Sequence, residues 1–313
     1  MAERRLLGLA IAAILAAVAF LAIGIRGNIA FVLELRLLKL AALVQVGVAI
    51  AISTVIFQTV TGNRILTPSI MGLDALYLFG QMLMVFLLGG VGYVALDPQL
   101  KFGMEVLLLM ALAAALLLPM LKSRLDMGLM LLAGVVFGVL FRSLYSLLAR
   151  LIDPNEFAVA QSASFANFNA VRTDLLVFAA IVTVIAAIIA WRARHILDVI
   201  SLGPDTATGL GVGWAGTVTG LLLVVAALVA VSTALVGPVA FFGLLVAALA
   251  ERIVDSRRHG LLLPAAAFAG IIVLVGGQTL FQHVLGNATA LGVVIEFVGG
   301  LVFLLLLVLG SRK

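Results

Sequence analysis

The sequence predicts an all-α integral membrane protein with about ten transmembrane helices, and two observations support this fold class. Of the 313 residues, 65% are hydrophobic and only 11% are charged, and the mean hydropathy is +1.32. A soluble domain of this length needs a more polar surface, so lipid is the solvent for most of the chain. The basic residues also lie in loops between long apolar runs, which is the pattern of a protein that crosses a membrane repeatedly.

Nine long apolar runs, separated by charged or Gly/Pro-rich breaks, are expected to be membrane-spanning helices. They cover residues 6–25, 37–60, 73–95, 104–121, 127–150, 173–191, 212–235, 261–283 and 291–310. A tenth run, Phe241–Ala250, is too short to cross lipid alone, and we expect a half-length helix buried among the others. The run within Met1–Ile25 resembles a signal peptide but lacks a small-residue cleavage site before Arg26, so an uncleaved first helix is expected. Residues 1–313 then form a single transmembrane domain.

The distribution of Lys and Arg predicts the orientation of these helices. If the N-terminus is inside, most of the nineteen basic residues fall in inside segments, namely Arg4, Arg5, Arg64, Lys122, Arg124, Arg192, Arg194, Arg252, Arg257, Arg258, Arg312 and Lys313. Cytoplasmic loops carry an excess of Lys and Arg. Both termini and the segment of mixed polarity at 191–214 are therefore expected in the cytoplasm.

Several classes of function are disfavoured by what the sequence lacks. Without cysteine, disulfide and thiolate chemistry are impossible, and the three scattered histidines, at 195, 259 and 283, do not suggest a metal site. Phosphate-binding loops and hydrolase motifs are also missing, so we expect no enzymatic activity, no cofactor and no metal. Dispersed basic residues do not suggest nucleic acid. The few charges inside spans form no proton relay, which disfavours an ion-coupled secondary transporter but keeps it as an alternative.

Residues 46–74, VGVAIAISTVIFQTVTGNRILTPSIMGLD, resemble the FecCD-type permeases of bacterial ATP-binding-cassette (ABC) importers, the membrane subunits for iron-siderophore, haem and cobalamin uptake. The matching positions are Val46, Gly47, Ser53, Gln58, Thr61, Asn63, Pro68 and Gly72. Two later stretches, SLGPDTATGLGV at 201–212 and GPVAFFGLLVA at 237–247, resemble further segments of that family. The resemblance extends from about residue 35 to the C-terminus and implies the same ten-helix fold.

The resemblance implies a permease subunit of the siderophore branch of type II importers, in the bacterial cytoplasmic (inner) membrane. Such a subunit has no chemical step. It moves an iron-siderophore chelate from a periplasmic or lipid-anchored substrate-binding protein into the cytoplasm, while two copies of a separate ABC ATPase hydrolyse ATP. The family's Pro-His pair is Ala247-Ala248 here, which resembles permeases that pair with a paralogous subunit, so a heterodimer is expected. Cobalamin or haem remains an alternative cargo.

The segment at about 192–212, between the sixth and seventh spans, is expected to form two short cytoplasmic coupling helices. Apolar side chains would follow one side of the first helix, with Asp198 pointing elsewhere. Gly203 can end that helix, and Pro204 at the first turn favours the start of the second. The resemblance implies that the ATPase is contacted by Leu202, Gly203, Asp205, Ala207, Leu210 and Gly211. Thr208 replaces an arginine common in the family, and a polar connector on the membrane surface is the alternative interpretation.

Two further sets of site residues are expected. Arg36 and Lys39 match the family's basic pair at the start of the second span, which implies docking of the substrate-binding protein, with interfacial anchoring as the alternative. The residues expected along the transport pathway are Gln58, Asn63, Phe137, Phe141, Tyr145, Gly237 and Pro238. Ordinary packing is the alternative for each of these.

Overall fold

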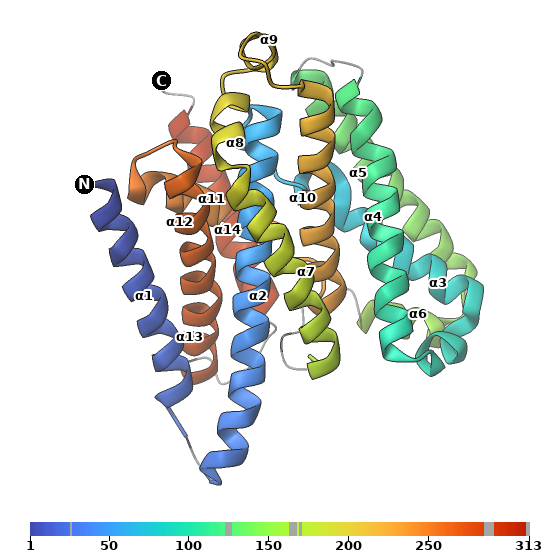
Figure 1. The fold of residues 1–313 in the computed structure, drawn as a ribbon. Helices are drawn as coiled ribbons and strands as arrows, with labels where there is room; N and C mark the ends of the chain where they lie inside the picture. The colour runs from blue at the N-terminus through green and yellow to red at the C-terminus, as the bar shows by residue number, and fades with distance from the viewer. Residues whose placement is uncertain (26, 123–126, 163–167, 169–170, 285–290, 311–313) are drawn as a thin grey trace.

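Each apolar run expected to cross the membrane forms a helix in the computed structural model, which describes residues 1–25, 27–122, 127–162, 168, 171–284 and 291–310 (Figure 1). The long helices are α1 (Ala2–Ala22), α2 (Ile29–Thr61), α3 (Asp74–Ala95), α4 (Pro98–Lys122), α5 (Met127–Leu151), α7 (Thr173–Arg192), α10 (Trp214–Val236) and α14 (Leu291–Gly310). The shorter ones are α6 (Pro154–Ser162), α8 (Arg194–Ile200), α9 (Pro204–Gly209), α11 (Phe242–Val254), α12 (His259–Ile271) and α13 (Gly277–Val284). Two π-helical turns complete the set, η1 (Ser69–Leu73) and η2 (Ile272–Gly276).

The all-α membrane class is confirmed. Within the described residues, eight helical segments are long and apolar enough to span a bilayer, and no strand occurs there. One of these segments joins α12, η2 and α13 into a single span at His259–His283, where one helix is expected. The expected half-length helix corresponds to α11, which has 13 residues. The number of ten crossings stays a prediction.

Two local features of the α3 region are not predicted by the sequence. Gly89 takes a left-handed backbone (φ 71°, ψ 159°) that breaks the regular geometry of α3. The short helix α6 then brings Glu156 against the break, where its Oε1 accepts the N–H of Gly90 at 2.9 Å. A side-chain carboxylate thus satisfies a backbone donor that the broken helix leaves open.

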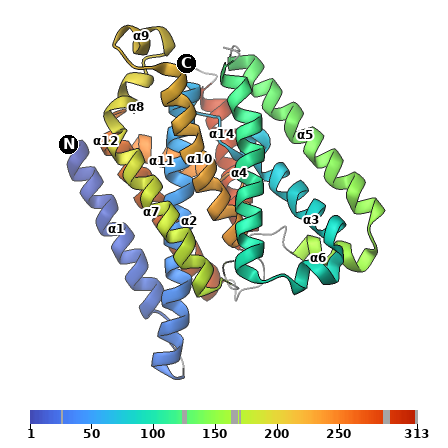
Figure 2. The same cartoon turned by 45° about the vertical axis from the view of Figure 1, so that its right-hand side comes forward.

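The core of the bundle is formed around α2 and α10, whose central residues are almost all buried. Helix α2 packs against α12, α10 and α7, and α10 packs against α4 (Figures 1 and 2). Glycines bring the backbones together where α2 crosses α12. A Cβ atom added to Gly270 would lie 2.5 Å from the carbonyl oxygen of Gly47, so no larger residue fits this crossing. Such small-residue contacts replace hydrophobic driving force between helices in lipid.

The two ends of the bundle differ in what they carry. The start of α1, the last turn of α14 and both short helices α8 and α9 lie at the same end (Figure 1). This matches the charge distribution, which predicts the two termini and segment 191–214 on one side. The side of the membrane to which this end belongs stays a prediction.

Candidate coupling site

Helix α8 is built into the bundle. Only Ala193 separates it from α7, and its N–H bonds back to Ile189 at 2.9 Å, so α8 continues almost directly from a long helix. Leu197 and Ile200, one turn apart, are 0% and 1% exposed within the main core. Neighbours of α8 are α12, α2 and α7. Helix α8 is therefore anchored in the packed core through these two side chains.

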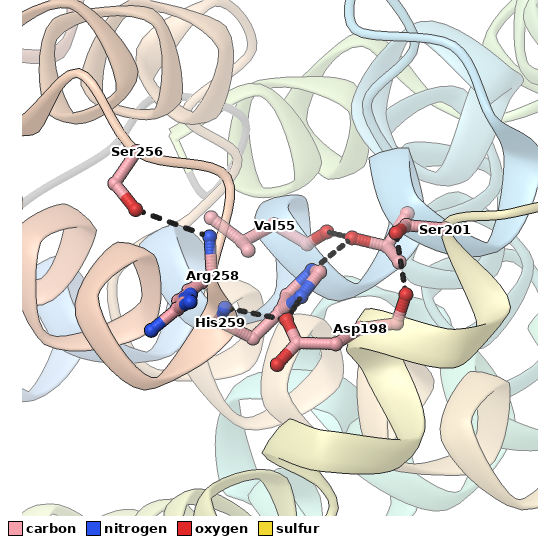
Figure 3. A network of polar contacts seen from close by, with 7 residues as sticks. Val55, Asp198, Ser201, Ser256, Arg258 and His259 are labelled. Atoms are coloured by element: carbon pink, nitrogen blue, oxygen red, sulfur yellow. Dashed lines mark hydrogen bonds and ion pairs between the residues drawn. The ribbon is translucent and has the colours of Figure 1, made fainter.

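Asp198 lies on α8 between those two core residues and faces the first residue of α12 (Figure 3). Its Oδ1 accepts the backbone N–H of His259 at 2.8 Å and lies 2.7 Å from the ring Nδ1 of the same residue. The backbone carbonyl of Asp198 accepts the hydroxyl of Ser201 at 2.6 Å. The His259 side chain is 3% exposed and the Asp198 side chain 35%, so the imidazole lies inside the protein while the carboxylate is at its edge.

The joint between α8 and α9 requires glycine. Gly203 has φ 96° and ψ 166°, a conformation that side chains with a Cβ rarely adopt. The N–H groups of Leu202 and Gly203 bond to the carbonyls of Val199 and Ile200, which closes the end of α8. Pro204 follows at the first position of α9, where its missing N–H costs nothing. The chain therefore turns sharply and restarts as a second helix.

Helix α9 ends in a Schellman motif. The N–H of Val212 bonds to the carbonyl of Ala207 and that of Gly211 to Thr208, both at 3.0 Å, with Gly211 at φ 87°. Ala207 is fully buried, whereas the other residues of α9 are exposed. Thr208 donates its hydroxyl to the carbonyl of Pro204 at 2.7 Å, so the side chain that replaces the family arginine is used inside the helix.

Two leucines flank α9 and are open to solvent. Leu202 is 58% exposed and Leu210 is 62% exposed, at the tip of a projection that stands clear of the long helices (Figures 1 and 2). Between the two leucines in the chain, Asp205, Thr206 and Thr208 are exposed polar residues. Exposed apolar groups with a polar rim are typical of protein–protein contact surfaces. The α8–α9 projection thus presents a small apolar surface of the kind that fits into a cleft on another protein.

Comparison with known proteins identifies the group to which the chain is related. The family model described as the FecCD transport family matches residues 19–309, most of the chain. The chain belongs to the FecCD transport family. The petrobactin import system permease protein of Bacillus subtilis is 44% identical over 288 residues, covering 92% of this chain and 91% of the relative. That of Bacillus anthracis is 31% identical over 276 residues, covering 87% and 77%.

A solved structure has the same fold. A chain from an inward-facing metal-chelate type ABC transporter superposes with a TM-score of 0.84 at 21% identity, covering 98% of this chain and 99% of that chain. Membership of the FecCD family, with the eight apolar helices, identifies the protein as a multi-pass membrane permease.

The six residues for which the FecCD resemblance implies ATPase contact fall into two groups. Leu202, Gly203, Asp205, Leu210 and Gly211 lie on the surface of the α8–α9 projection. Ala207 lies beneath them with no exposed surface, and its carbonyl accepts the N–H of Val212, which links α9 to the chain that follows. Their contact with an ATPase stays a prediction.

Arg36 has a role that the sequence does not predict. Its Nη1 donates to the carbonyls of Phe20, Leu21 and Ile23, and its Nη2 donates to that of Gly24. These are the carbonyls that the end of α1 leaves without helical partners, and a cation there is also favoured by the helix dipole. With only 9% exposure, Arg36 caps α1, and its contact with a substrate-binding protein stays a prediction. Lys39, one turn further on, is half-buried.

The residues expected along the pathway lie in three parts of the bundle. Gln58 donates to the carbonyl of Arg64, and Asn63 accepts the N–H of Ile65, so both support the loop after α2.

The aromatic residues lie where α5 packs against α3. The ring of Phe141 lies 5.6 Å from that of Phe79 on α3 and 6.5 Å from that of Phe137 on α5. Tyr145 packs against the buried cluster that contains Met82, Val85 and Tyr93. Gly237 and Pro238 lie in the buried turn before α11.

Two polar residues of this region have a place that sequence reasoning missed. Asp198 is expected to point away from the packed face of α8, and His259 is only one of three scattered histidines. The structure joins them although they lie 61 residues apart. The sequence feature that could have indicated this contact lies at the start of α12. The residue before that helix, Arg258, supplies no side-chain cap, so the first N–H groups need an acceptor from another segment. Within the described residues, no three potential metal ligands come together, and neither residue belongs to such a group.

Proposed function

We propose that the protein is the permease subunit of an ATP-driven importer that carries an iron-siderophore chelate into the bacterial cytoplasm. The observation that carries this proposal is the 44% identity, along nearly the whole of both chains, to a petrobactin import system permease protein. Petrobactin is therefore the first cargo to test. A relative named as a vitamin B12 import system permease protein is 30% identical over 281 residues, which keeps cobalamin as the second candidate.

The α8–α9 projection supplies the mechanical part of this function. The permease needs no chemical step, because ATP hydrolysis takes place on two ATPase subunits bound at the cytoplasmic end. The exposed leucines of the tip fit a cleft on an ATPase, and the polar rim gives the contact a defined orientation. Since Leu197 and Ile200 are packed in the core, movement of the tip is passed to the long helices rather than absorbed in a loose loop.

The remaining partners follow from the same assignment. The end that carries α8 and α9 lies in the cytoplasm, with both termini, as the excess of basic residues there suggests. A substrate-binding protein docks at the opposite end, where Lys39 is the basic residue to test first. A paralogous permease completes the complex as a heterodimer, in keeping with Ala247-Ala248 in place of the family's Pro-His pair.

The test is ATP-dependent uptake of radiolabelled ferric petrobactin by proteoliposomes that contain the permease, its companion permease and the ATPase, with loaded binding protein outside. Uptake that needs ATP and is not reduced by excess cobalamin or haem is the expected result. Uptake of cobalamin in place of the ferric chelate would move the assignment to the second candidate. Uptake driven by an ion gradient without ATP, or an ATPase that never co-purifies with the permease, would contradict the proposal.

A further inference from the structure

We propose that Asp198 and His259 are positioning residues that pass movement of α8 to α12 and α2. The inference rests on the proposed function of the α8–α9 projection and names the route by which its movement leaves the projection. It starts from one contact between two helices that are distant in sequence, drawn in Figure 3.

Asp198 acts as the N-terminal cap of a helix to which it does not belong. The first N–H groups of a helix have no partner within it, and a carboxylate beside them is also favoured by the helix dipole. Helix α12 starts at His259 without a capping side chain from its own Arg258. The N–H of His259 is satisfied instead by Oδ1 of Asp198, at 2.8 Å, from α8. The start of α12 is thereby tied to the coupling projection.

The imidazole of His259 extends this tie to α2. Its Nδ1 faces the Asp198 carboxylate, which can only accept, so Nδ1 carries a proton. Its Nε2 lies 2.7 Å from Oγ1 of Thr59, and the Thr59 hydroxyl donates to the carbonyl oxygen of Val55, with 2.8 Å between the two oxygens. One buried side chain thus joins α8, α12 and the last turn of α2.

The two helices so joined already have a fixed crossing elsewhere. The backbones of α2 and α12 touch at Gly47 and Gly270, eleven residues further along α12 from His259, or about 16 Å at helical rise. Pro264 lies between the two attachments and removes one helical hydrogen bond there. A pull on the start of α12 therefore acts on a segment held at its far end by the glycine crossing, and it moves the end of α2 with it.

Other polar links at the same end of the bundle are weaker candidates. Arg64 pairs with Glu251 at 2.8 Å, and Arg5 lies 3.8 Å from Asp255, but three of these four side chains are about half exposed or more. Exposed ion pairs contribute little, because water screens them and two long side chains must be ordered. The Asp198 side chain is itself 35% exposed, but its partner His259 is buried, and one carboxylate oxygen contacts both the ring and the backbone N–H of that residue. Two contacts to one buried residue leave the Asp198–His259 link less freedom than a single exposed ion pair.

The decisive variant is Asp198→Ala in the reconstituted importer, with Asp97→Ala as its matched control. Asp97 likewise accepts N–H groups at a helix start, from Gln99 and Leu100 at the beginning of α4, at the end of the bundle opposite α8 and α9 (Figures 1 and 2). The measured quantity is ferric chelate imported per ATP hydrolysed, in complexes normalised for folded protein and bound ATPase. A residue that only stabilises the fold changes the yield of complex and leaves this ratio unchanged.

The expected result is that Asp198→Ala retains the ATPase but imports about two- to thirtyfold less chelate per ATP, the range for residues that modulate coupling between sites. Asp198→Asn keeps an oxygen for the N–H of His259 and should recover part of the ratio, while Asp97→Ala should match the wild type. Thr59→Val keeps the shape of the side chain but removes the hydroxyl that contacts His259, so it should lower the ratio less than Asp198→Ala does. If Asp198→Ala does not fold, the result for Thr59→Val tests the inference in its place. A wild-type ratio in both Asp198→Ala and Thr59→Val would overturn the inference. Failure of the wild-type chain to bind any ATPase would instead contradict the proposed function.

Discussion

The two short helices of the coupling segment have nearly the same length and opposite environments. Helix α8 inserts Leu197 and Ile200 into the core and holds the start of α12 through Asp198. Helix α9 buries only Ala207 and leaves the adjacent Leu202 and Leu210 in solvent. The difference shows that the segment has a fixed base and a presented tip. A projection of this kind can bind a partner without strain in the bundle and still pass on the partner's movement.

The largest effect on stability is expected at the base. Leu197→Ala removes a side chain with no exposed surface, and truncations of this kind cost about 2–5 kcal/mol. We expect a clear fall in the melting temperature of the detergent-solubilised permease, measured by fluorescence-detected unfolding. A melting temperature equal to that of the wild type would mean that α8 is not anchored, and the distinction between base and tip would fail.

A smaller effect is expected at the joint. Gly203→Ala introduces a Cβ into a conformation that is almost restricted to glycine, at a cost of about 1–3 kcal/mol, although no atom lies within 4 Å of that Cβ. Gly209→Ala is the matched control, because Gly209 lies in the helix α9, without a positive φ and also without neighbours within 4 Å. Thermal unfolding should separate the two variants, with Gly209→Ala at or slightly above the wild type. Equal losses in both would show that the joint is not strained.

The smallest effect on stability is expected at the tip, together with a large effect on binding. Leu210→Asp changes an exposed side chain, so the free energy of unfolding should stay within about 0.5 kcal/mol of the wild type. Loss of an apolar contact at the centre of an interface should weaken ATPase binding about 30-fold or more. Leu151→Asp, at the end of α5, is the control, since Leu151 has the same 62% exposure. ATPase pull-down from detergent measures both, and retention by Leu210→Asp would remove the tip from the interface.

Local chemistry allowed the shape of the coupling segment to be predicted. Gly203 and Pro204 are residues whose backbone preferences hold in any context, and the structure ends α8 and starts α9 at these two positions. The long apolar runs are equally dependable, because lipid requires backbone hydrogen bonds to be satisfied within each span. The break of α3 is different. Gly89 lies in a glycine-rich run that suggests close packing, and only the position of Glu156 on α6 favours a break there.

Contacts between distant segments could not be predicted in the same way. Arg36 matches a basic pair of the family and is expected at a surface, yet it caps the end of α1. Asp198 and His259 each have an ordinary interpretation when taken alone. The contact between them depends on how α12 packs beside α8 and α2, and no local sequence pattern predicts that packing. The two short helices are therefore predictable from sequence, while the contacts that anchor α8 need the fold.

The most direct test of this account uses the absence of cysteine from the chain. Leu210→Cys and Leu151→Cys each create a single thiol, on residues of equal exposure at the tip and at the end of α5. The labelling rate of each variant with a water-soluble maleimide is measured with and without bound ATPase. We predict that the ATPase slows labelling of Leu210→Cys at least tenfold and leaves Leu151→Cys unchanged. Equal labelling of Leu210→Cys in the free permease and in the purified complex would contradict the assignment of the projection as the coupling site.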